Sequence, residues 1–202
     1  MFNYLYDFAF NIYLLLFHPK YFFERKKEKA DDLMAALPYF LFGIGIASIA
    51  YPFNSISNPM NSSFPSVASF ILEYIFSICM GTNIFLIETI FVFIIIRILG
   101  EKLPYRNILA TMLFLPIFLI GNLIVSVTLF LSESIVPISA IFCWVASFIA
   151  MTILFIWKSY CGIIGLSTMQ QIDKRVATVG ILLSFSFFYV LRVLSALGLL
   201  IN

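Results

Sequence analysis

The fold is decided by the stretch Ser69–Arg106, which reads SFILEYIFSICMGTNIFLIETIFVFIIIRILGEKLPYR. Its apolar part extends from about Ser69 to Leu99. That length is enough to cross a bilayer at a tilt, because a helical span needs about 20 apolar residues. Basic residues gather where the run ends and beyond it. An apolar run followed by a basic turn predicts a membrane-spanning helix whose end faces the cytoplasm.

The same alternation recurs along the chain. Lysines and arginines outside the apolar runs form three clusters: Lys20, Arg25, Lys26, Lys27 and Lys29; then Arg97, Lys102 and Arg106; then Lys158, Lys174 and Arg175. The loops at 51–67 and 131–135 carry no lysine or arginine. Because basic loops stay in the cytoplasm, the pattern predicts a cytoplasmic N-terminus, a C-terminus outside and an odd number of spans.

The apolar runs predict an all-α integral membrane protein with a bundle of five transmembrane helices in residues 33–202. The spans are expected at about 33–53, 69–99, 108–131, 136–157 and 176–201. Pro116 falls inside the third span and predicts a helix kink there. The composition agrees, since 62% of the residues are hydrophobic and 11% are charged, whereas soluble domains carry about 25% charge. A transmembrane barrel would instead show strands of alternating polarity.

Residues 1–32 are expected to form a separate N-terminal region. Asn3, Asp7 and Asn11 recur every four residues within an apolar stretch, which gives a helix one narrow polar stripe. This predicts an amphipathic helix lying in the membrane interface, with its tyrosines at headgroup depth. The alternative is a short extra span. The charged segment that follows, residues 18–32, is expected to place its lysines against anionic headgroups.

Four polar residues interrupt the predicted spans, namely Glu73, Asn83, Glu88 and Arg192. Ionisable groups inside a membrane usually face the bundle interior and find partners. We expect Glu73 or Glu88 to contact Arg192, because Glu73 and Arg192 lie at similar depths below the outer surface. These residues then serve as links between spans two and five. The alternative is a path for protons or cations along Glu73, Asn83 and Glu88.

Other functional classes find little support in the sequence. A net charge of +2 does not indicate nucleic acid binding. The single histidine, His18, and three cysteines in apolar surroundings predict no catalytic residues, metal site or cofactor. Gln170 and Gln171 precede the last span, and the pattern assigns no chemistry to them.

Several segments resemble proteins of the Yip1-domain family. These are HPKYFFER at 18–25, PYRNIL at 104–109 followed by Pro116, IWK at 156–158, GIIGLS at 162–167 and KRVA at 174–177. The resemblance extends from about residue 18 to the C-terminus and implies five spans with the N-terminus inside. Eukaryotic members lie in endoplasmic reticulum and Golgi membranes and are linked to Rab GTPases. With only 17 residues ahead of the match, the chain is expected to be the short prokaryotic form, for which no Rab connection is implied.

The expected function is non-enzymatic. The three basic clusters would form a cytoplasmic face that binds anionic lipid headgroups, a membrane-protein partner or a second copy of the chain. The alternative is a small transporter or channel that uses Glu73, Asn83 and Glu88. The expected location is a prokaryotic cell membrane, with the endoplasmic reticulum or Golgi as the alternative.

Overall fold

A computed structural model describes residues 2–49, 67–121, 123–124, 127–128 and 140–196. The described residues form helices: α1 (Phe2–Phe17), α2 (Pro19–Lys26), the 3-10 turn η1 (Lys27–Lys29), α3 (Leu33–Ser48), α5 (Val67–Ile98), α6 (Tyr105–Met112), the 3-10 turn η2 (Leu115–Phe118), α8 (Ala140–Met169) and α9 (Lys174–Ala196). The sequence-based expectation of an all-α fold is therefore confirmed for these residues.

Polar and proline residues fix several helix starts. Asp32 begins α3, and its side chain accepts hydrogen bonds from the backbone N–H groups of Met34 and Ala35 at 3.0 and 3.3 Å. Pro19 occupies the first turn of α2, where a missing N–H costs nothing. The carboxylate of Asp173 accepts from the N–H of Arg175 at 2.7 Å at the start of α9.

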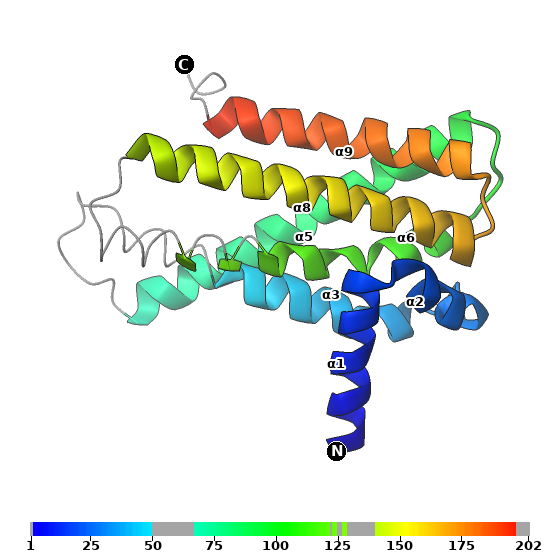
Figure 1. Cartoon of the computed structure of the whole chain (residues 1–202), viewed down its shortest axis with the longest axis horizontal. Helices are drawn as coiled ribbons and strands as arrows, with labels where there is room; N and C mark the ends of the chain where they lie inside the picture. Colours follow the sequence, from blue (N-terminus) through cyan, green and yellow to red (C-terminus); the bar gives the residue numbers. More distant parts are fainter. Residues whose placement is uncertain (1, 50–66, 122, 125–126, 129–139, 197–202) are drawn as a thin grey trace.

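Helices α3, α5, α6, α8 and α9 extend along the long axis of the molecule, and α1 runs across it (Figure 1). Helix α9 packs on both α5 and α8, while α3 packs on α5 and on η2. Gly43 permits the contact between α3 and η2, because a Cβ at this position would overlap the backbone of Pro116 and Ile117. Pro116 itself lies in η2, where the helical path changes from α to 3-10 geometry.

Three helical segments in the described part of the chain are long and apolar enough to cross a membrane: Val67–Ile98, Phe148–Met169 and Lys174–Leu191. Leu33–Ser48 and Tyr105–Gly121 are apolar but shorter. These helices support a helical membrane protein. The five spans and the division at residue 32 stay predictions, and residues 50–66 and 129–139 of the expected loops and spans lie outside the described residues.

Helix α8 differs from its expected extent. The sequence pattern predicts a span that ends at about Trp157, but α8 continues to Met169. Gly162 and Gly165 lie inside this helix, where small residues admit close neighbours. A Cβ on Gly165 would come within 2.8 Å of Thr111 and 2.9 Å of Phe23. The extra turns of α8 thus form the surface on which α2 and α6 pack.

Aromatic rings fill the core at the junction of α2, α3 and η2. Phe22 and Phe23 are fully buried. The ring of Phe22 lies 5.1 Å from that of Phe114 and 5.9 Å from that of Tyr39, both edge-on. Such pairs contribute about 0.5–1.5 kcal/mol each beyond the area that they bury. The short helix α2 is therefore anchored to the bundle by its two adjacent phenylalanines.

Candidate functional site

The side-chain amide of Gln170 joins three segments that lie far apart in the sequence. Its Nε2 atom donates to the carbonyl oxygens of Ala30 and Asn107 at 2.7 and 2.9 Å, and lies 3.1 Å from Oγ1 of Thr111. Gln170 is buried, 8% exposed. Each segment so joined carries or adjoins one of the basic clusters. The amide therefore holds the three clusters, apart from Lys158, at one end of the bundle.

A second contact reinforces this end. Nε of Arg106 donates to the carbonyl oxygen of Asp31 at 3.0 Å, so the start of α6 is tied to the segment before α3. The turn after α5, the turn after α8 and helix α2 gather at the right-hand end of the molecule in Figure 1. The sequence pattern alone assigns no chemistry to Gln170. A signal was available, because a glutamine that ends a long apolar helix requires hydrogen-bonding partners.

Nine of the predicted basic residues are exposed at this end. They are Lys20, Arg25, Lys27, Lys29, Arg97, Lys102, Arg106, Lys174 and Arg175, and we call them the basic face. Lys20 lies 3.9 Å from Glu24, and both side chains are open to solvent, so this pair leaves the face basic. Lys26 is half-buried and does not belong to the face.

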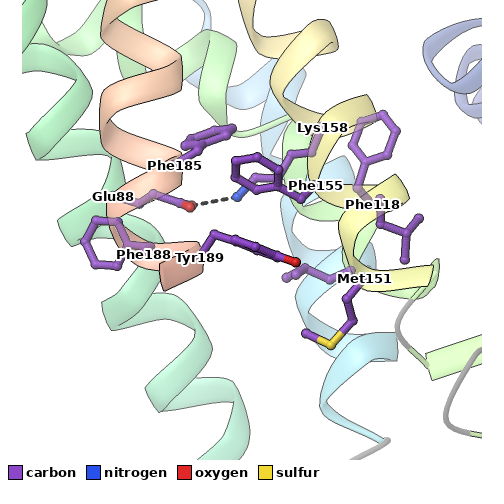
Figure 2. Close-up of a pocket in the computed structure, with 10 residues that line it drawn as sticks. Glu88, Phe118, Met151, Phe155, Lys158, Phe185, Phe188 and Tyr189 are labelled. Carbon is purple, nitrogen blue, oxygen red and sulfur yellow. Dashed lines mark hydrogen bonds and ion pairs between the residues drawn. The ribbon is translucent and has the colours of Figure 1, made fainter. Parts of the chain in front are cut away.

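Lys158 also departs from the expected arrangement. Its Nζ lies 2.7 Å from Oε2 of Glu88, and the two side chains are only 17% and 11% exposed. The ammonium group is also 4.1 Å from the ring centroid of Phe185, which adds a cation–π contact. Figure 2 shows Glu88 and Lys158 facing each other between α5 and α8. Lys158 is thus an interior residue that links two helices.

The pair lines a cavity of about 60 Å³ whose other walls are aliphatic and aromatic, including Phe118, Phe155 and Tyr189. The hydroxyl of Ser184 donates to the carbonyl oxygen of Glu88 at 3.0 Å, so α9 also contacts this part of α5. A volume of this size admits a few water molecules. Water in the cavity would supply the additional polar partners that a buried ion pair needs, since each charge loses its hydration.

Two other predicted intramembrane residues, Glu73 and Asn83, lie away from this cavity. Glu73 and Asn83 do not line it, and Asn83 is exposed on the surface of α5. The Oε2 atom of Glu73 is buried without a hydrogen-bond partner among the residues that the structure describes. The side chain of Arg192 lies outside the described residues, so its contact with Glu73 or Glu88 stays a prediction.

The sequence pattern does not predict the Glu88–Lys158 pair, because the fourth predicted span ends at about residue 157 and α8 continues to Met169. Glu88 lies ten residues before the end of α5, and Lys158 lies eleven residues before the end of α8. At about 1.5 Å per residue these positions have similar depth below the basic end. Depth matching would have found the pair if α8 had been extended to Met169.

In the described part of the chain, no group of three or more His, Cys, Asp or Glu side chains could hold a metal ion.

Comparison with known proteins agrees with this architecture. Neither the curated proteins nor the solved structures include a match to the chain. The family model described as the Yip1 domain matches residues 13–196, which include every helix from the end of α1 to α9. The match covers all the segments on which the resemblance was based, and it includes both Gln170 and the Glu88–Lys158 pair. This helical membrane protein therefore belongs to the Yip1-domain family.

Proposed function

We propose that the protein is a non-enzymatic membrane protein that binds anionic lipid through its basic face. The observation that carries the proposal is the Gln170 amide, which joins the segments of the three basic clusters. One lysine or arginine near an anionic membrane surface contributes about 1 kcal/mol, so nine cations at one end of the molecule act together. A cytoplasmic location of this face follows from the positive-inside rule and is part of the proposal.

Family membership supports the proposal at a coarser level, because it indicates a membrane protein of non-enzymatic type. The choice of lipid over a protein partner comes from the exposed cations on the segments that Gln170 joins. Among the described residues none of these cations pairs with a buried carboxylate, unlike Lys158, and they lie next to the helices that would enter the bilayer. Anionic lipid headgroups at the cytoplasmic surface of a membrane attract basic segments of this kind.

Trp157 provides a reporter for the test. It is 38% exposed, and its Nε1 donates to the carbonyl oxygen of Leu16 at 2.8 Å, near the segment that carries Lys20. The protein with Trp144→Phe is reconstituted into phosphatidylcholine bilayers containing either brominated phosphatidylglycerol or brominated phosphatidylcholine. Bromine quenches tryptophan on contact. We expect stronger quenching by the anionic lipid, and a smaller difference at high salt, where surface charges are screened.

The matched variant neutralises part of the basic face by changing Lys102, Arg106, Lys174 and Arg175 to glutamine. We expect it to lose much of the preference for the anionic lipid. The control variant, Glu24→Gln with Glu28→Gln, also replaces charged side chains by glutamine, but it removes negative charge. It should therefore retain the preference for the anionic lipid. Equal quenching by both lipids in the unmodified protein would refute the proposed function.

Transport is a second candidate function, favoured by the cavity beside the Glu88–Lys158 pair. Its volume of about 60 Å³ suits water or a proton better than a larger solute. Proteoliposomes under a proton or potassium gradient test this directly. Flux above that of protein-free vesicles, abolished by Glu88→Gln, would favour transport. Flux equal to that of empty vesicles would leave the ion pair with a structural role.

A further inference from the structure

A second cavity, of about 200 Å³, lies where α1 crosses the beginning of α3. Its polar lining comes from three separate helical segments of the N-terminal part of the chain. The residues are Tyr4, Asp7 and Asn11 from α1, Lys26 and Lys29 from α2 and η1, and Tyr39 from α3. Two cations, an amide, two phenols and a carboxylate thus line one half-open cavity.

Lys26 lines this cavity but forms no ion pair in it with any described residue. Its Nζ lies 5.9 Å from the ring centroid of Phe22 and 5.8 Å from that of Tyr39, and the side chain is half-buried. Among the described residues Lys26 forms no ion pair with a carboxylate. Burial, followed by the charges of Lys29 and Arg25, lowers the pKa of its ammonium group below the usual value. A bound anion would oppose both effects, because a nearby negative charge favours the charged form of the ammonium group.

The position of the cavity suits a membrane surface. Helix α1 presents large side chains on its free side, with Tyr6, Phe10, Tyr13 and Phe17 all exposed. Tyrosine side chains of this kind concentrate at the depth of lipid headgroups. On α3, the exposed Leu41 and Phe42 continue from the cavity along the helix, away from the basic end. An anion in the cavity could therefore carry an acyl chain that lies on apolar protein surface.

We propose that this cavity binds the phosphodiester of one phospholipid headgroup, with Lys26 and Lys29 contacting its oxygens and Asp7 accepting a hydrogen bond from the polar end of the headgroup. The inference rests on the proposed function, since it assigns one specific site next to a face that attracts anionic lipid generally. The volume has room for roughly six water molecules of ~30 Å³ each. That space suits a headgroup and leaves the acyl chains outside.

The test measures lipid binding by native mass spectrometry of the full chain in detergent, titrated with phosphatidylglycerol. Lys26→Gln and Lys29→Gln change the cavity, whereas Lys27→Gln removes the same charge from an exposed neighbour that does not line it. We expect one tightly retained lipid, an affinity loss of about tenfold in each cavity variant, and a loss below about twofold for Lys27→Gln. Lys29 is exposed, so its variant stays informative if Lys26→Gln impairs folding.

Inorganic phosphate and glycerophosphoglycerol identify the source of the phosphate group. We expect neither compound alone to bind at concentrations where the lipid is retained, because the acyl chains contribute to binding. Equal affinity for the lipid and for free phosphate would refute a lipid site. Equal effects of Lys26→Gln and Lys27→Gln would refute the cavity as the site. In the latter case the proposed function would still stand if the four-residue variant of the basic face abolished the anionic preference.

Discussion

At the scale of single residues, Gln170 is expected to matter most for the basic end. Gln170→Met keeps the length of the side chain but removes the donor that serves Ala30, Asn107 and Thr111. Each acceptor left buried without a partner costs about 1–3 kcal/mol. We expect a clear drop in the thermal unfolding temperature of the protein in detergent. Size-exclusion chromatography of samples heated to increasing temperatures measures this drop.

Gln171→Met is the matched control, because Gln171 is the next residue and is exposed. It has a φ of 56°, and exchanging one unbranched side chain for another leaves that backbone strain unchanged. We expect nearly unchanged stability for this variant. If both substitutions lowered the unfolding temperature equally, the Gln170 amide would not be what joins the three segments.

A pair of glycines on α3 offers a second test at this scale. A Cβ at Gly43 would overlap the backbone of Pro116 and Ile117, whereas a Cβ at Gly45 would meet only the hydroxyl of Tyr74 at 3.7 Å. Gly43→Ala should therefore destabilise the protein by about 1–3 kcal/mol or more, through overpacking. Gly45→Ala should be neutral or slightly stabilising, because alanine favours helix. Denaturant titrations of both variants in one detergent would check this, and the opposite ranking would contradict the α3–η2 contact.

At the scale of helices, the Glu88–Lys158 pair links α5 to α8. Removing one partner leaves a buried, uncompensated charge, which costs about 3–5 kcal/mol. We expect Lys158→Met to be strongly destabilising, and Glu88→Gln with Lys158→Met together to restore much of the loss. Unfolding free energies of both single variants and the double variant measure the coupling. Purely additive effects would show that the two side chains do not interact.

The helices themselves were easier to predict than their partners. Long apolar runs such as Ser69–Leu99 require helices because lipid offers no hydrogen bonds to an open backbone, so the all-α class followed from the sequence. Glu88 was recognised as a buried polar residue, but its partner depends on where α8 ends and how it is rotated, and hydropathy encodes neither. Lys158 was assigned to the basic end because lysine usually marks the rim of a span. Gln170 was overlooked because its partners are backbone carbonyls of distant segments.

At the scale of the whole molecule, the contacts at Gln170 place the basic clusters together, and charge then predicts which side of the membrane they occupy. The three basic clusters lie on the same side of the bilayer only if the chain crosses it an even number of times between one cluster and the next. The long helix α5 must then connect the basic end to the uncharged loop at 51–67. This connection makes the orientation testable with one residue from each end.

Single cysteines at Lys102, Lys174 and Asn58, in a chain whose three native cysteines are replaced by alanine, provide that test. A membrane-impermeant maleimide added to sealed cells should label Asn58→Cys and leave Lys102→Cys and Lys174→Cys unmodified until the membrane is opened. The two lysine positions are exposed and lie at the end that Gln170 holds together, so they serve as mutual controls. Labelling of all three positions from the same side would contradict the topology. It would also remove the basis for a cytoplasmic lipid-binding face, because anionic lipids are enriched in the cytoplasmic leaflet.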